Sequence, residues 1–71
     1  MRAEYTRAEY EELADEACAR LLIEDDTTPA TILSDCCHDA INEVRTRRLV
    51  SDEQVIGAIC TIALRILRED F

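Results

Sequence analysis

Two complete helix-start signatures constrain this chain more than any other feature of its sequence. Thr6 is followed three residues later by Glu9, and Ser51 is followed three residues later by Gln54. Such pairs form capping boxes, in which the side chain of each residue accepts a hydrogen bond from the backbone N–H of the other. Two helices are therefore expected to begin just after Thr6 and Ser51.

A third helix is expected between them, with Thr28 as its N-cap and Pro29 in its first position, where a proline has no hydrogen bond to lose. After each start, apolar residues recur at steps of three and four. The connections are short, so sequential helices are expected to be antiparallel neighbours. The sequence predicts an all-α fold, a single antiparallel three-helix bundle spanning residues 1–71 with helices at about 7–24, 29–47 and 52–68.

Composition excludes several other classes of protein. One Gly and one Pro in 71 residues are too few for the turns of an all-β fold. An apolar content of 48% is too high for a disordered acidic tail. No stretch approaches about 18 uncharged apolar residues, so no membrane contact is expected. No secretory signal is visible, so a cytoplasmic location with reduced thiols is expected.

The charge balance favours basic partners. The chain has sixteen acidic residues and eight basic ones, all of them Arg, which gives a formal net charge of -8. Such a chain repels phosphate backbones, so direct binding of nucleic acid is not expected. Adaptation to high salt would explain the same acid excess, and composition does not separate the two.

The third helix carries more apolar surface than a small bundle normally buries. Its apolar residues cover about 200° of the helical wheel, against about 100° for an ordinary surface helix. We expect a homodimer that uses this face, because large exposed apolar patches mark interaction sites. Scattered exposed apolar residues are the alternative. The residues expected at this interface lie off the core stripes of their helices: Ile23, Ile32, Ile62 and Leu64.

The four cysteines invite a metal interpretation that their spacing does not favour. No CxxC or HxxxH motif is present. On one helix, Cys36, Cys37 and His38 point in three directions about 100° apart. Cys18, Cys37 and Cys60 are each expected near mid-helix, so a tri-thiolate metal site or a disulfide is conceivable in that layer. Plain core thiols are favoured, and no cofactor is expected.

Acidic pairs form a second constellation. Glu12 and Glu16, like Asp35 and Asp39, lie four residues apart and share a helix face. Paired acids on two helices can hold Mg²⁺ for phosphate chemistry, as in all-α nucleotide pyrophosphatases. Both pairs point away from their core stripes, so they are not expected to converge within one chain. A solvated face or a protein-binding surface is favoured over an active site.

The loop after the first helix is a stronger candidate for partner contact. Its three acids lie at the helix C-terminus, where the helix dipole disfavours negative charge. A sequence optimised only for stability would place cations there. These three acids are Glu24, Asp25 and Asp26.

The one basic cluster, Arg45, Arg47 and Arg48, lies at the end of the second helix. Cations suit the negative end of a helix dipole, so the cluster is interpreted first as a helix C-terminus signal. A salt-bridge role, within a dimer or with another acidic protein, is the second interpretation.

These observations favour an interaction protein over an enzyme. We expect a small acidic module that docks on, and inhibits, a basic surface of a nucleic-acid-binding protein by standing in for the charge of DNA. Small acidic chains occur among phage-encoded inhibitors, including anti-CRISPR proteins, and the likeness is one of size and charge only. The alternatives are a metal- or redox-responsive thiol protein or a small metal-dependent nucleotide hydrolase. Phosphate loops are impossible with one Gly, and no nucleophile lies near a Gly-rich turn.

Overall fold

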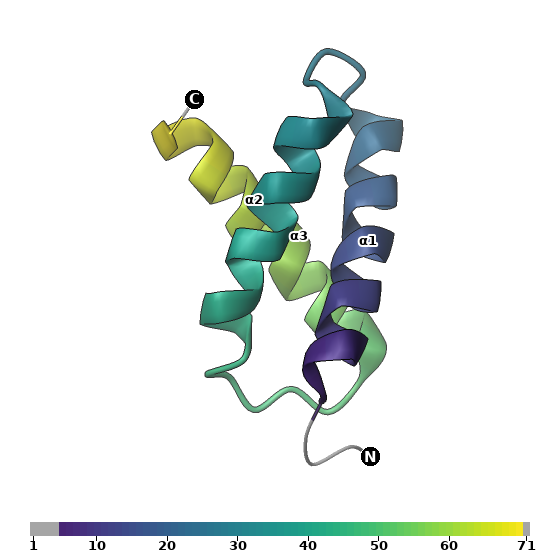
Figure 1. Cartoon of the computed structure of the whole chain (residues 1–71), viewed down its shortest axis with the longest axis vertical. Helices are drawn as coiled ribbons and strands as arrows, with labels where there is room; N and C mark the ends of the chain where they lie inside the picture. The colour runs from purple at the N-terminus through teal and green to yellow at the C-terminus, as the bar shows by residue number, and fades with distance from the viewer. Residues whose placement is uncertain (1–4, 71) are drawn as a thin grey trace.

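The computed structural model describes residues 5–70, which form three helices and no strands. They are α1 (Arg7–Glu24), α2 (Ala30–Val44) and α3 (Asp52–Asp70). α1 and α3 run in the same direction and α2 runs against them (Figure 1). The all-α three-helix bundle is therefore confirmed, and the described part of the chain measures 36 × 21 × 17 Å.

The start of α1 has the expected capping box. The backbone N–H of Glu9 donates to Thr6 Oγ1 at 3.2 Å, and the N–H of Thr6 donates to Glu9 Oε1 at 3.0 Å. The rings of Tyr5 and Tyr10 pack against each other with centroids 5.5 Å apart, as a hydrophobic staple predicts.

α3 begins with a variant of the same motif. The N–H of Gln54 donates to Ser51 Oγ at 3.2 Å, so Ser51 is the expected cap. The side chain of Gln54 reaches back one residue further than expected and accepts from the N–H of Val50 at 3.0 Å. Two of the N–H groups that a helix start leaves without partners are satisfied in this way.

α2 differs from its prediction at both ends. Pro29, not Thr28, is the N-cap, because the hydroxyl of Thr28 donates to Asp25 Oδ2 at 2.7 Å. The helix ends at Val44 rather than near residue 47. The N–H of Thr46 bonds the carbonyl of Glu43 three residues back at 3.2 Å, which tightens the last turn and ends the α-helical ladder.

α3 continues two residues beyond its predicted end, to Asp70. Each of the three helices packs against both others and buries one stripe of its surface. Fourteen apolar residues form the common core: Ala14, Ala17, Cys18, Leu21, Leu33, Cys36, Cys37, Ala40, Val44, Val55, Ile56, Ile59, Ile62 and Ala63.

The apolar arc of α3 is partly covered within one chain. Ile62 is only 3% exposed and belongs to the core, so its expected position at an exposed edge is wrong. Leu64 and Ile32 are half-buried against the same core. Of the residues expected at a dimer interface, only Ile23 projects into solvent, with 85% of its surface exposed.

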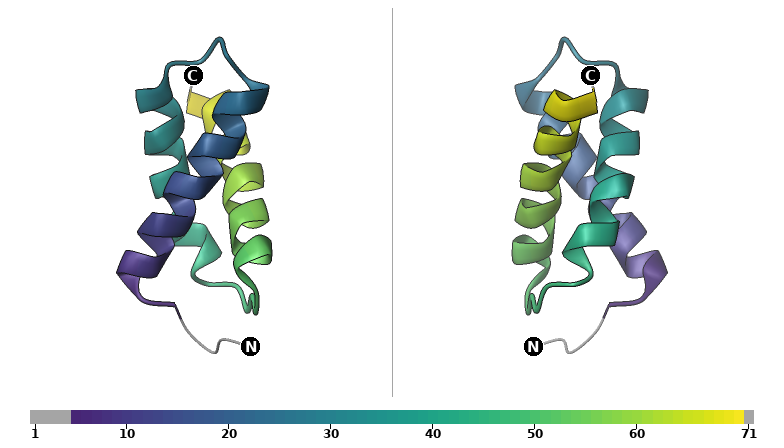
Figure 2. Two further views of the ribbon diagram at one scale, coloured as in Figure 1. Left: turned by 90° about the vertical axis from the view of Figure 1, so that its right-hand side faces the viewer. Right: turned by 90° about the vertical axis from the view of Figure 1, so that its left-hand side faces the viewer.

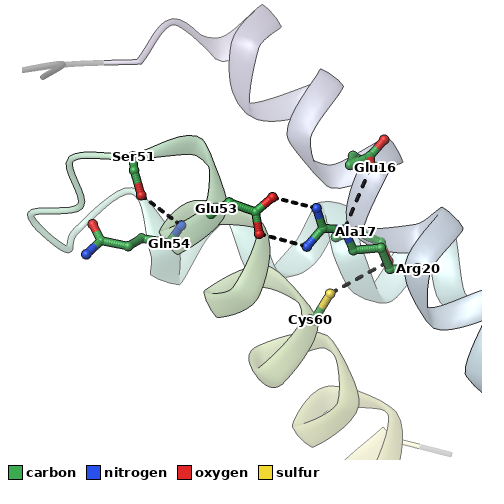
Figure 3. A network of polar contacts seen from close by, with 7 residues as sticks. All are labelled: Glu16, Ala17, Arg20, Ser51, Glu53, Gln54 and Cys60. Atoms are coloured by element: carbon green, nitrogen blue, oxygen red, sulfur yellow. Dashed lines mark hydrogen bonds and ion pairs between the residues drawn. The ribbon is translucent and has the colours of Figure 1, made fainter.

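Two ion pairs fasten α3 to the other helices. The guanidinium of Arg20 on α1 donates two hydrogen bonds to the carboxylate of Glu53 (Figure 3). Arg65 Nη2 lies 2.7 Å from Glu43 Oε1 on α2. No helix within residues 5–70 is both long and apolar enough to cross a bilayer.

Candidate functional site

The loop between α1 and α2 lies at the same end of the bundle as the C-terminal end of α3 (Figures 1 and 2). This follows from the topology, because two parallel helices end on the same side. Acidic runs that are more than forty residues apart in the sequence therefore share one end of the molecule. We call this surface the acidic end and define it as Glu24, Asp25, Asp26, Glu69 and Asp70.

Three carboxylates of the acidic end have no counter-charge in the described part of the chain. Glu24, Asp26 and Asp70 are exposed and form no ion pair with any of residues 5–70. Glu69 lies 4.0 Å from Arg65, at the limit of an ion pair. The acidic end therefore carries uncompensated negative charge that a basic surface would neutralise.

Asp25 differs from its neighbours because its carboxylate organises the loop. Oδ1 accepts from the N–H groups of Thr27 and Thr28 at 2.9 and 3.2 Å and from the Thr27 hydroxyl at 2.8 Å. Hydrogen bonds from both threonine side chains and both backbone groups hold the pKa of Asp25 well below its usual range. These hydrogen bonds explain why an acid lies at this helix C-terminus. The carboxylate of Asp25 is already hydrogen-bonded within the loop in the free chain.

The acidic pairs on the helix faces lie apart from one another. On α1, Glu16 Oε1 lies 3.8 Å from Arg20 Nε, and Glu12 is exposed without an ion pair among residues 5–70. On α2, Asp35 and Asp39 are also exposed. The two pairs do not converge on one site.

Asp35 and Asp39 instead lie near the C-terminal end of α3. Burial raises the pKa of the Cys36 thiol most, and the negative charges of Asp39, Asp70 and Asp35 raise that pKa further. Asp70 of α3 and the two acids of α2 therefore act electrostatically on the same thiol.

The expected thiol layer is present, with all four cysteines free. Burial raises the pKa of Cys37 to about 12, and the neighbouring Cys18 and Cys60 add to the effect. Cys60 Sγ donates to the carbonyl of Ala17 at 3.7 Å (Figure 3). Within residues 5–70, no three His, Cys, Asp or Glu side chains are placed to hold a metal ion. A thiol with a raised pKa is a poor nucleophile and a poor metal ligand near neutral pH.

The opposite end of the bundle holds an open groove of about 1070 Å³. It lies between the start of α1, the second half of α2 and the segment that leads to α3. Four of the eight arginines line it, together with both tyrosines and the exposed Val50. We call it the basic groove and define it by Arg7, Arg45, Arg47, Arg48, Tyr10 and Val50.

Two of the four groove arginines are available to a ligand. Arg7 Nε lies 3.7 Å from Glu11, and Arg47 Nη2 lies 3.5 Å from Glu43. Arg45 and Arg48 are exposed and make no ion pair within the described residues. The groove is thus a positive site on a strongly negative protein.

His38 also lines the basic groove. Its Nε2 is 3.3 Å from Asp15 Oδ1, and this contact joins α2 to α1. Its side chain is 39% exposed.

Sequence reasoning missed the basic groove and the contribution of α3 to the acidic end. The run from Arg45 to Arg48 was visible, but it was interpreted first as a helix terminus. Arg7 was not connected with it, because the two are nearly forty residues apart. The signal that would have connected them is the antiparallel topology itself, which places the start of α1 beside the end of α2.

Comparisons with protein-family models, with curated proteins and with solved structures find no match to this chain. The functional argument therefore depends on its own surfaces.

Proposed function

We propose that this chain is a small acidic interaction protein of the cytoplasm, which docks through its acidic end on a basic surface of a nucleic-acid-binding protein. The observation that carries the proposal is the meeting of two acidic runs at one end of the bundle. Glu24, Asp26 and Asp70 lack counter-charges among the described residues, so binding costs them no internal ion pair.

The proposed mode of action is inhibition by charge mimicry. A basic surface that normally contacts phosphates would meet carboxylates fixed at the ends of two packed helices. Complementary charge raises association rates and selects the partner surface. The partner's cations would then be unavailable to its nucleic acid. Phage-encoded inhibitors are the class of small acidic chain that this mode of action fits.

The thiol and metal alternatives have less support. The raised pKa values of the cysteines oppose thiolate chemistry at neutral pH. The acidic pairs of α1 and α2 lie on separate outer faces, so a carboxylate site for Mg²⁺ is not assembled between these helices. Binding is thus favoured over catalysis.

A competition experiment tests the proposal. A labelled DNA duplex is held by a purified histone-like protein, and the chain is added at low salt while free DNA is measured by fluorescence anisotropy. The wild-type chain is expected to displace the DNA. A variant with Glu24→Gln, Asp26→Asn and Asp70→Asn is expected to need at least about ten times the concentration, which corresponds to about 1.4 kcal/mol.

The matched control carries the same charge change elsewhere. Glu12→Gln, Asp15→Asn and Glu16→Gln also remove three negative charges, and this variant should displace DNA nearly as well as the wild type. Equal losses in the two variants would assign the effect to net charge, and the acidic end would no longer be the docking surface.

A further inference from the structure

The acidic end and the basic groove each carry an exposed apolar side chain. Ile23, 85% exposed, directly precedes Glu24 in the acidic end. Val50, 45% exposed, lines the basic groove together with the arginines and Tyr10. Leu22, 37% exposed, precedes Ile23, so the exposed large apolar residues of the described chain lie at or beside the two regions of opposite charge. Each region combines exposed apolar surface with charges of a single predominant sign.

We infer that the acidic end of one copy of this chain docks in the basic groove of a second copy. In this arrangement Glu24 and Asp26 meet Arg45 and Arg48, which are the groove arginines that form no ion pair within residues 5–70. Ile23 is covered by the apolar side chains that line the groove. A groove of about 1070 Å³ is large enough to receive the last turn of α1 and the first residues of the loop after it.

The charges of the groove select this occupant over nucleic acid. Glu11 and Asp39 also line the groove, and the whole chain has a net charge of -8, so a polyphosphate backbone would be repelled. The last turn of α1 and the loop after it bring only a few negative charges into the groove. The apolar side chains of the groove can also cover the exposed Ile23.

The two surfaces differ and lie at opposite ends of the bundle, so the contact is head to tail. Such a heterologous contact does not close as a two-fold dimer does; it extends into a ring or an open chain. This assembly differs from the dimer through α3 that the apolar arc predicts, and Ile62, one residue expected in that dimer, is buried within one chain.

The inference uses the acidic end that the proposed function also uses, so self-assembly and partner docking compete for one surface. Variants of the basic groove separate the two. They are expected to abolish self-assembly and to keep DNA displacement at least as strong as in the wild type, because the acidic end is then free. If DNA displacement fails while self-assembly persists, only the proposed function falls.

Two complementary variants test the inference by sedimentation velocity. One carries Glu24→Arg and Asp26→Arg and keeps an intact groove, whereas the other carries Arg45→Glu and Arg48→Glu and keeps an intact acidic end. Each alone is expected to be a monomer, because one half of every contact is repulsive. An equimolar mixture is expected to assemble, because the intact acidic end of one variant fits the intact groove of the other and the two charge-reversed surfaces attract each other.

The wild-type chain should increase in mass with concentration and return to monomer in high salt, because the Debye length falls from about 10 Å at 0.1 M to about 3 Å at 1 M. Glu12→Arg with Glu16→Arg should assemble like the wild type. Circular dichroism checks folding, and the milder Arg45→Gln with Arg48→Gln should also lose assembly. A wild-type chain that stays monomeric, or a mixture that does not assemble, overturns the inference.

Discussion

Arg20 on α1 and Glu53 in the first turn of α3 form a bidentate ion pair. Nη1 lies 3.0 Å from Oε2 and Nη2 lies 2.6 Å from Oε1 (Figure 3). Planar pairing of this kind is the best geometry for an Arg–carboxylate contact. Both side chains remain largely exposed, so solvent screens the attraction between them. The pair therefore positions α3 and adds little to the stability of the fold.

The pair predicts a pH-dependent stability difference. Hydrogen bonding from Arg20 lowers the pKa of Glu53 below its usual value near 4.5. Its contribution is therefore complete above that value and is lost as the pH falls through the lowered pKa. Glu53→Gln is expected to lower the Tm modestly at pH 7 and hardly at all in strong acid. The control, Glu12→Gln, should change the Tm little at either pH, and an equal Tm gap for Glu53→Gln at both pH values would contradict the assignment.

Adjacent acids in the α1–α2 loop should respond differently to substitution. Asp25→Ala removes the acceptor for four hydrogen bonds from Thr27 and Thr28, so it is expected to lower the Tm clearly. Asp26→Ala removes an exposed carboxylate near a helix C-terminus, so it should leave the Tm unchanged or slightly raised. Thermal unfolding followed by circular dichroism measures both, and equal losses would refute the separation of roles.

The thiols should differ in reactivity in the folded protein. Cys60 is only half-buried and should be alkylated first at pH 8. Cys36 and Cys37 are at most 1% exposed, and burial raises the pKa of both thiols, so their alkylation requires opening of the bundle. We expect Cys37 to react at least about a hundredfold more slowly than Cys60 until urea is added. Peptide mass mapping after timed quenching gives the order, and fast labelling of Cys37 would argue against its place in the core.

Two isoleucines that the sequence assigned to one interface should behave as opposites. Ile62→Val removes a buried methylene group and is expected to cost about 0.5–1.5 kcal/mol of unfolding free energy. Ile23→Ala alters an exposed side chain and should stay within about 0.5 kcal/mol. Urea denaturation at low protein concentration, where chains are separate, compares them. A larger loss of unfolding free energy for Ile23→Ala than for Ile62→Val would contradict the burial of Ile62 in the core.

Features that depend on neighbouring residues were predicted correctly. The caps at Thr6 and Ser51 form because their partners lie three residues away, so their geometry follows once a helix starts. The start of α2 was predicted less well because the Thr28 side chain could either accept a helix N–H as a cap or donate its hydroxyl to a nearby carboxylate. Asp25, three residues earlier, takes its hydroxyl, and Pro29 becomes the cap.

Features that depend on how helices pack were not visible on a single helical wheel. Ile62 lies off the centre of its apolar stripe, but its side chain is buried in the core that α3 forms with α1 and α2. Likewise, Arg7 and Arg48 share a groove only because antiparallel helices place the start of α1 beside the end of α2. Local patterns determine where helices begin, and tertiary packing determines which charges meet.

The most direct test of the acidic end as a docking surface is a titration of the ¹⁵N-labelled chain with an oligo-arginine peptide. Backbone amide shifts report the contact site without any substitution. We predict that the largest changes fall at residues 24–26 and 69–70, with little change around Glu12 and Glu16. Equal changes along all acidic faces, or none at the acidic end, would contradict the account.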